Sequence, residues 1–447
     1  MSASHAGDHF KTVELGSGIR FRYLSECKWK VLSIDVFFRV PLKREIVTQV
    51  AVIPRLLRRG TVNYPTLRHL SRHLENMYGA GMGADATKMG PMQVVRFGID
   101  IPSPRFLHFG GAEGDGDSLE GINLGKAMAF IWEVATDPYL ENGAFPKERF
   151  DMESEEHRRD ILSMVNDRPR YATVRMVEEL SKGNPSGLPS WGVLEDLPHI
   201  DPGKTWETWT DVMSSVPVSI YAIGEGAEEL GEILERVRLR FPKSRRVEVE
   251  EPETSPPPPP PESLLEVEDF LPGEQTLLCQ AFFTGITESH PMFPAAIVFD
   301  GILGGFPHSK LFMNIRERNS LAYFAHSSLN SWRGMVLTVA GVGDGTRHRV
   351  RDLVVEQVKA MKDGDISTEE LENTKAGLVR RLRSESDSQS ALVRRQVSRE
   401  IMGGTASLEE LVSRVLKVSK DDVVAVADKA EFKVVYALRA KGDGRDE

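Results

Sequence analysis

Arg316 and Tyr323 lie seven residues apart and could act together on a carbonyl group. A guanidinium and a phenol can both donate hydrogen bonds to a peptide carbonyl. Both also favour the oxyanion that forms when the carbonyl is attacked. The alternative interpretation is structural, because an Arg at a helix C-terminus interacts favourably with the helix dipole and a strand Tyr commonly packs in a core.

A helix is expected to hold Arg316. Gly304 and Gly305 interrupt an apolar run, and Pro307 and His308 then lead to Ser309, which has the position of an N-cap. The apolar residues that follow at helical spacing are Leu311, Phe312 and Ile315.

A strand is expected to hold Tyr323, because the period of the sequence drops to two after Ser320. One side of this strand would carry Leu321, Tyr323, Ala325 and Ser327. The other side would carry Ala322, Phe324, His326 and Ser328.

Other candidate sites are weaker. His69 and His73 have the i, i+4 spacing of a metal site, but no Glu lies between them, and a solvated basic helix face is the alternative. The acidic set in 153–160 has the pattern of a charged helix surface. The glycines of 110–116 lack the Lys of a P-loop, and no nucleophile elbow is present.

Composition limits the class of protein. The 447 residues include 56 basic and 66 acidic side chains, and the net charge of −10 argues against general binding to nucleic acid or anionic membranes. No apolar run could span a bilayer, and the first residues lack an apolar signal segment. Cys27 and Cys279 are expected to be buried thiols in a reducing compartment, so we expect a cytoplasmic protein.

Six consecutive prolines at 256–261 mark the clearest boundary. They favour a polyproline II spacer between two domains. The alternative, a ligand for a proline-binding module, lacks flanking recognition residues. We therefore expect an N-terminal domain at 1–245, a linker at 246–264 and a C-terminal domain at 265–447.

The two halves repeat one order of elements: strand, helix, helix, strand, strand, several helices and a final strand. A period of half the chain indicates a duplicated α/β-layered domain rather than a solenoid. In the first half, the helix predicted over 45–59 contains Pro54, so it should kink there or become regular only from Ile53.

Four segments resemble the M16 family, which includes insulinase, pitrilysin and the mitochondrial processing peptidase. They are LLRRGT at 56–61, LENMYGAGMGADATKMG at 74–90, GGFPHSKLFMNIRERNSLAYF at 304–324 and the closing VSKDDVVAVA. The resemblance covers nearly the whole chain. It implies an α+β fold with two homologous domains, each a mainly antiparallel sheet packed with helices, which face each other like a clamshell around a peptide.

Active members of that family carry H-x-x-E-H on a first-domain helix, where two His bind Zn²⁺ and the Glu activates water. The matching positions here are Ala51, Pro54 and Arg55, and the family's third ligand falls on Asp160. Alanine cannot ligate, proline cannot act as a base and Arg55 would repel a cation. We therefore expect no zinc site in this chain.

The Arg and Tyr that bind the substrate carbonyl in M16 enzymes match Arg316 and Tyr323 in type and spacing. The resemblance is strongest to a small bacterial branch that lacks the zinc motif and is linked to the 5-aminopentanol modification of elongation factor P.

Three hypotheses follow from this resemblance. The first is a subunit, inactive alone, that binds a peptide or protein substrate with a zinc-bearing M16 paralogue in a heterodimeric metalloendopeptidase. The second is a non-catalytic peptide-binding or scaffold protein. The third is a self-sufficient metallopeptidase that uses His69 and His73.

Overall fold

The computed structural model describes residues 10–103, 124–236, 239–242, 256–404 and 406–441. These residues form two compact units. We call residues 10–162 with 188–242 the N-terminal unit, and residues 163–187 with 256–441 the C-terminal unit. The glycine-rich segment at 105–125, predicted to be a loop or a bulged strand followed by a turn, falls almost entirely outside the described residues.

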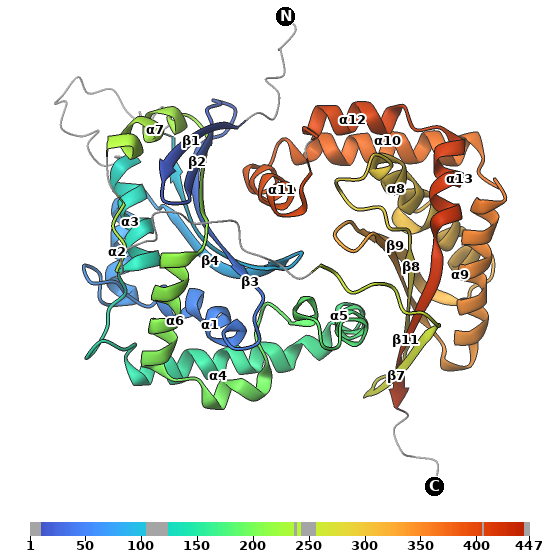
Figure 1. The fold of residues 1–447 in the computed structure, drawn as a ribbon, viewed down its shortest axis with the longest axis horizontal. Helices are drawn as coiled ribbons and strands as arrows, with labels where there is room; N and C mark the ends of the chain where they lie inside the picture. The colour runs from blue at the N-terminus through green and yellow to red at the C-terminus, as the bar shows by residue number, and fades with distance from the viewer. Residues whose placement is uncertain (1–9, 104–123, 237–238, 243–255, 405, 442–447) are drawn as a thin grey trace, which may run out of the picture. The chain divides into compact units, whose positions relative to one another are not determined.

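The N-terminal unit is built on a sheet of order β1-β2-β6-β3-β5-β4, in which β2 and β6 are parallel and all other neighbours antiparallel. The strands are β1 (Lys11–Gly16), β2 (Ile19–Leu24), β3 (Val31–Pro41), β4 (Gly81–Met89), β5 (Met92–Pro102) and β6 (Val218–Ile223). Its helices are α1 (Val47–Leu57), α2 (Leu67–Asn76), α3 (Leu124–Thr136), α4 (Lys147–Ser163), α6 (Pro202–Ser215) and α7 (Ala227–Arg236) (Figure 1).

Helix α1 runs without interruption through Pro54, so the alternative in which the regular helix begins near Ile53 is wrong. A proline within a helix removes one backbone hydrogen bond and costs about 3 kcal/mol. Burial offsets this cost, because apolar residues on both sides of Pro54, among them Val50 and Leu56, pack in the core of the unit.

The C-terminal unit is built on a sheet of order β7-β11-β8-β10-β9, with only β7 and β11 parallel among its neighbours. Its strands are β7 (Leu265–Pro272), β8 (Thr276–Phe283), β9 (Ala322–Asn330), β10 (Met335–Val342) and β11 (Glu431–Lys441). The order matches β2-β6-β3-β5-β4 strand for strand. The predicted two-sheet α+β fold is therefore confirmed, while the clamshell stays a prediction.

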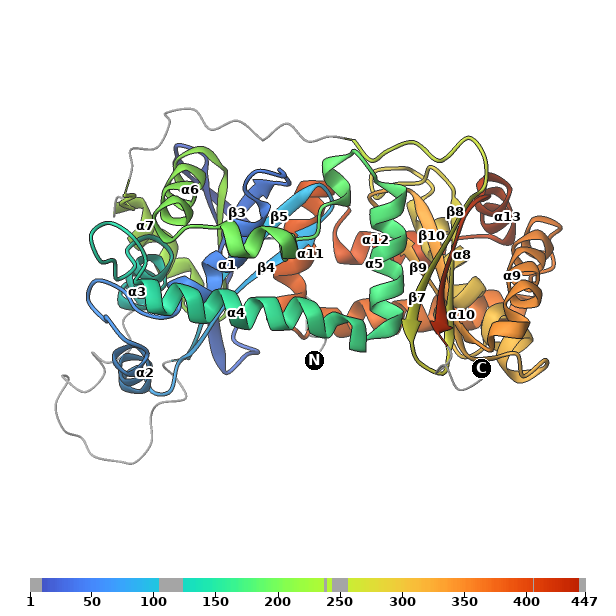
Figure 2. The same ribbon diagram turned by 90° about the horizontal axis from the view of Figure 1, so that it is seen from below.

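Helices cover both faces of the C-terminal sheet. One face packs against α8 (Phe293–Asp300), α9 (Arg347–Lys362), α10 (Thr368–Glu385), α12 (Leu408–Leu416) and α13 (Lys420–Lys429). Helix α11 (Gln389–Met402) follows α10. The other face packs against α5 (Arg168–Leu180), as Figure 2 shows.

Helix α5 lies within the predicted domain 1–245 but packs in the C-terminal unit. Its Ala172, Met176 and Leu180 cover a sheet face that includes Cys279 and Tyr436. That apolar face needs a cover, and the sequence pattern of α5 does not say which sheet supplies it. The chain therefore reaches the second sheet long before the proline run.

Three arginines tie α5 and the loop after it to the sheet. Arg168 donates to the carbonyl oxygens of Pro272 (2.6 Å) and Gln275 (2.9 Å), and Arg175 pairs with Asp269 at 3.1 Å. Arg333, which is almost fully buried, donates to Ser181 Oγ at 2.6 Å. Burial without a nearby carboxylate lowers the pKa of Arg333 to about 10.

The two cysteines differ from each other. Cys279 is buried, as predicted, and burial raises the pKa of its thiol to about 12. Cys27 is exposed, so the prediction that it is buried is wrong. It lies in a turn between β2 and β3 rather than in either strand.

The docking of α5 can be measured through Met176, which is fully buried. Met176→Ala should lower the free energy of unfolding by about 2–5 kcal/mol, because it leaves a cavity between α5 and the sheet. Met152→Ala on α4 is the matched control, since Met152 is 44% exposed and its loss should change stability by about 0.5 kcal/mol or less. Urea denaturation measures both. Equal effects would contradict the docking of α5.

Candidate functional site

Arg316 lies in a π-helical segment, Phe312–Glu317, rather than in a regular α-helix. The Arg318 N–H bonds to the Met313 carbonyl five residues back at 3.0 Å, which is the π pattern. Segments of this type are uncommon and recur at functional sites. Arg316 is the basic residue of its last turn, as predicted.

Three polar contacts fix this segment against neighbouring helices. Buried Lys310 pairs with Glu370 of α10 at 3.0 Å, and Asn314 donates to Gln357 of α9 at 2.6 Å. His308 lies 3.0 Å from the Thr374 hydroxyl. These tethers were missed by the sequence analysis, because each joins residues 43 to 66 positions apart.

Electrostatics support the Lys310 tether. Burial alone would raise the pKa of the Glu370 carboxyl, but the Ser367 N–H and the Lys310 ammonium outweigh it and lower that pKa. Glu370 also belongs to the capping box that begins α10 with Ser367. The Glu370 carboxylate thus caps the start of α10 and also pairs with Lys310, just before the π-helical segment.

Ser309 does not act as the predicted side-chain N-cap. Its N–H bonds to the Phe306 carbonyl at 3.0 Å, and its carbonyl accepts from Met313. Its hydroxyl is buried without a hydrogen-bond partner among the described residues. The helix begins near the predicted position, but Ser309 is packed inward there.

The Arg316 guanidinium is held loosely and remains accessible. Its carbon lies 4.7 Å from the centre of the Phe312 ring, and Nε is 3.7 Å from a Glu317 carboxylate oxygen. The side chain is 46% exposed. A contact of this length between exposed groups is weak, so most of the donors of Arg316 remain available for a ligand.

Tyr323 is the most exposed large apolar side chain among the described residues, at 73%. It lies on β9, the edge strand of the sheet. The interpretation of Tyr323 as a packing residue is therefore wrong, since its ring is largely in solvent. An exposed phenol on an edge strand can reach a ligand without displacing the core.

Regular alternation along β9 fails at Tyr323. Ala322 pairs with Val342 of β10, and Phe324 pairs with the preceding Gly341, so Tyr323 is an extra residue in a β-bulge. Ala322 packs with Ala325 in the core, although they were predicted on opposite sides. The predicted alternation is wrong at this point.

The turn between the two candidate residues is also irregular. The Ser320 N–H bonds to the Arg316 carbonyl at 3.1 Å, and the Leu321 N–H bonds to the Ile315 carbonyl at 3.0 Å. Ser320 has a positive φ of 51°, which is uncommon for a residue other than glycine. The turn therefore returns directly onto the π-helical segment, which packs against β9.

An ion pair joins two of the positions that match the family's zinc motif, Arg55 and Asp160. Ala51 is buried in α1, and Arg55 reaches from α1 to α4, where it forms an ion pair with Asp160. Glu156 lies 3.9 Å from the same guanidinium. Asp160, which was predicted to match the family's third ligand, thus has a cation of the chain itself as its partner.

A second ion pair lies beside the first. Arg59, in the turn after α1, pairs with Glu153 of α4, which is 2% exposed, and Glu156 lies 3.6 Å from the same guanidinium. Burial raises the pKa of Glu153, and the attraction of Arg59 opposes that rise. We refer to Arg55, Arg59, Glu153, Glu156 and Asp160 as the α1–α4 ion-pair cluster.

Zn²⁺ does not fit these residues. The carboxylates of Asp160 and Glu153 are already paired with guanidinium groups, and a dication there would be repelled by two arginines. In the described part of the chain, no group of three His, Cys, Asp or Glu side chains is placed to hold a metal ion.

His69 and His73 are engaged in other contacts. His69 Nδ1 lies 2.8 Å from the Thr66 hydroxyl at the start of α2. The His73 ring packs 4.3 Å from Tyr64 and 4.7 Å from Phe130, and burial lowers its pKa. An aromatic cluster therefore explains His73 better than a metal site.

The acidic set of α4 is not a ligand set either. His157 is buried and its Nε2 lies 2.7 Å from the Trp191 carbonyl oxygen. Glu155 pairs at the surface with Arg158 at 2.7 Å, and this contact helps to lower its pKa to about 2. The helix thus carries structural ion pairs on two of its faces.

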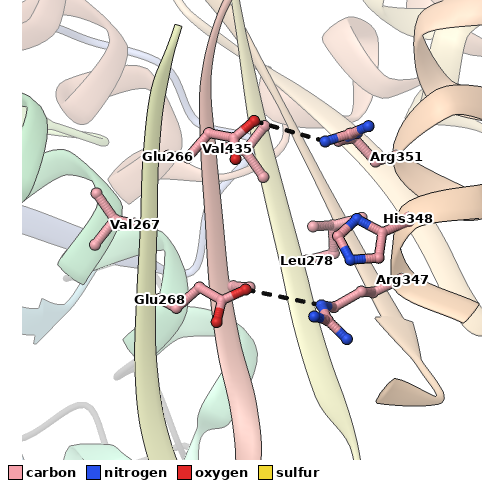
Figure 3. Close-up of a pocket in the computed structure, with 9 residues that line it drawn as sticks. Glu266, Val267, Glu268, Leu278, Arg347, His348, Arg351 and Val435 are labelled. Carbon is pink, nitrogen blue, oxygen red and sulfur yellow. Dashed lines mark ion pairs between the residues drawn. The ribbon is translucent and has the colours of Figure 1, made fainter. Parts of the chain in front are cut away.

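A small pocket of the C-terminal unit lies between β7, β11, β8 and α9 (Figure 3). Its volume is about 40 Å³, enough for roughly one water molecule. Glu266 pairs with Arg351 at 3.6 Å and Glu268 with Arg347 at 3.8 Å across its walls. With its charges already paired, this pocket offers no ligand site.

The comparisons point to one class of protein. Residues 214–378 match the family model described as "Peptidase M16 inactive domain". Over 413 residues the chain is 27% identical to the "Probable inactive metalloprotease YmfF" of Bacillus subtilis (strain 168), covering 92% of this chain and 93% of that protein. A shorter match of 168 residues, 29% identical, covers 37% of this chain and 41% of the "Uncharacterized zinc protease YmxG" of the same organism.

Solved structures share the fold. A conserved protein from Enterococcus faecalis V583 aligns with a TM-score of 0.86 at 25% identity, covering 97% of this chain and 99% of that one. A peptidase M16 inactive domain from Pseudomonas fluorescens aligns at 0.74 and 16% identity, covering 97% and 98%. The chain is thus M16-like and homologous to a probable inactive metalloprotease. Within the described residues, no helix is both long and apolar enough to cross a bilayer.

The α1–α4 ion-pair cluster yields a pH-dependent prediction. Arg59→Met should destabilise the protein by about 2–3 kcal/mol, below the 3–5 kcal/mol of a fully buried pair because Arg59 is 24% exposed. Without Arg59 the pKa of Glu153 rises further. In the folded variant, Glu153 then binds a proton more tightly than it does in the unfolded chain. The loss of unfolding free energy caused by Arg59→Met should therefore be smaller at pH 5 than at pH 8.

Urea denaturation at both pH values measures this loss. Arg158→Met is the control, since its exposed pair with Glu155 on the same helix should contribute about 1 kcal/mol or less. An Arg59→Met effect that is no larger than the control, or that grows toward pH 5, would contradict the role of the cluster.

Proposed function

We propose that this chain is a zinc-lacking subunit that supplies Arg316 and Tyr323 to a peptidase formed with an H-x-x-E-H partner. The observation that carries the proposal is the exposure of both donors, 46% for the Arg316 side chain and 73% for Tyr323, on irregular backbone that the surrounding contacts hold in place. The contacts of Arg316 with Phe312 and Glu317 are weak, so both donors remain available to a ligand.

In this proposal Arg316 and Tyr323 donate hydrogen bonds to the carbonyl oxygen of a bound peptide. The bonds strengthen as that oxygen gains negative charge, so they favour the transition state over the ground state. The metal-bound hydrolytic chemistry belongs to the partner, because the matching positions of this chain hold the α1–α4 ion-pair cluster. The chain would therefore be inactive alone.

The second candidate is a non-catalytic peptide-binding or scaffold protein. The α1–α4 ion-pair cluster supports the scaffold as well as it supports the catalytic subunit, because both proposals assume that the metal ligands are lost. The two differ in whether removing a donor changes turnover of the complex or only its affinity for peptide. Cys27 and Cys279 form no disulfide among the described residues, which supports a reducing, cytoplasmic location for either candidate.

Arg316→Ala tests the leading proposal. In the complex with the zinc-bearing paralogue, turnover of a peptide should fall about 10²-fold or more, because one donor to the developing oxyanion is lost. Arg318→Ala is the matched control, since Arg318 is exposed two residues away and bonds to Asn314 at 2.9 Å. It should leave turnover near the wild-type rate.

Assembly must be followed in the same samples by size-exclusion chromatography. Arg316→Ala should form the complex normally. Wild-type turnover in the Arg316→Ala complex would contradict the catalytic proposal, and a change in peptide affinity alone would favour the scaffold.

The resemblance to the zinc-lacking bacterial branch extends the proposal to the 5-aminopentanol modification of elongation factor P. A strain that lacks this chain should produce elongation factor P without the mass of that group, measured on the intact protein. A strain expressing the Arg316→Ala chain separates catalysis from scaffolding in the cell. Full modification in the deletion strain would contradict this extension.

A further inference from the structure

The bulge at Tyr323 has a cause outside β9. Ala322 is 8% exposed and packs in the core on the helix-covered face that includes α8 and α9, whereas Phe324 packs on the opposite face that α5 covers. In a regular strand, residues i and i+2 point to the same face. Ala322 and Phe324 can lie on opposite faces only if Tyr323 is an extra residue that interrupts the regular alternation of side chains along the strand.

Gly341 of β10 provides the space that holds Phe324 on its face. A Cβ at position 341 would lie 2.6 Å from Phe324 Cε1 and 2.7 Å from Gln275 Oε1. Real side chains do not approach so closely, so the Phe324 ring lies directly over the glycine. An aromatic ring that covers a glycine on the neighbouring strand is a known way of fixing strand register.

The two obstacles differ in how easily they could move. The Gln275 amide is the end of a flexible side chain and can shift. The Phe324 ring is packed against the sheet face under α5 and stacks on His326, with ring centres 5.6 Å apart. Any side chain at position 341 would therefore displace the ring and remove the pairing that forces Tyr323 outward.

We propose that Gly341 and Phe324 are positioning residues for Tyr323: by occupying the α5-covered face they hold the bulge that turns the phenol into solvent. The inference rests on the proposed function for its effect on turnover. The geometric part, that Gly341 controls the exposure of Tyr323, is independent of that function and can be measured on the isolated chain.

Gly341→Ala tests the geometric part through the nitration of Tyr323 by tetranitromethane, followed by mass spectrometry. The rate at Tyr323 should fall severalfold, because the phenol loses its bulged, exposed position. Phe324→Leu should act in the same direction without adding bulk, which keeps the test decisive if Gly341→Ala does not fold. Unchanged nitration in folded samples of both variants would overturn the inference.

Gly404→Ala is the matched control. A Cβ there would lie 2.7 Å from Glu288 Oε1, also in the C-terminal unit, so this variant adds the same methyl group outside the sheet. It should leave nitration of Tyr323 unchanged, because the flexible Glu288 side chain can shift. A similar drop in nitration for Gly404→Ala would show a general loosening of the unit and overturn the assignment.

A double-variant cycle in the assembled complex tests the effect on turnover. If Tyr323 is a donor, Tyr323→Phe should lower kcat about 10²-fold, and Gly341→Ala should lower it by a similar factor with little change in KM. Gly341→Ala should add nothing further in the Tyr323→Phe background, since it acts only through the phenol. Full additivity would overturn the positioning role.

The two failures are distinguishable. If Tyr323→Phe leaves kcat unchanged, the proposed function fails for Tyr323, while a reduced nitration rate in Gly341→Ala still supports the positioning. If Tyr323→Phe lowers kcat but Gly341→Ala changes neither kcat nor nitration, the positioning fails and the function stands.

Discussion

Two donor side chains are kept in solvent by a backbone that is irregular at three successive points. Arg316 lies in a π-helical segment, Ser320 has a positive φ, and Tyr323 is the extra residue of a β-bulge. Each irregularity gives up regular hydrogen bonding or favoured dihedral angles, and each persists because packing around it is fixed. The Lys310–Glu370 and Asn314–Gln357 contacts supply part of that packing.

The contrast with the N-terminal unit is chemical. There, α1 and the turn after it contribute two guanidinium groups, α4 contributes three carboxylates, and these opposite charges pair with one another. Either a metal ion or an ion pair can hold two helices together, but only the metal ion can activate water. Arg55 thus joins α1 to α4 through its ion pair with Asp160, but a guanidinium in that place cannot activate water.

Local patterns explain what could be predicted from the sequence. The helix predicted over 45–59 is found as α1, because its apolar periodicity lies within the segment itself. The expectation that the chain has no zinc site rests on residue type alone, at Ala51, Pro54 and Arg55.

What could not be predicted depends on distant residues. Strand β4 includes Gly81 and Gly83, which weaken a strand, and it is held in the sheet by its pairing with β5. The position of α5 depends on the apolar face of the second sheet. The exposure of Tyr323 depends on Gly341, which lies 18 residues further along the chain.

The central claim is that Arg316 and Tyr323 act as one unit on the same developing charge. The most direct test is the kcat of the reconstituted heterodimer carrying Arg316→Ala and Tyr323→Phe together, compared with each single variant. Groups that share one oxyanion are non-additive, so the double variant should be slower than the worse single variant by about threefold or less. Wild-type kcat in the double variant would contradict the account.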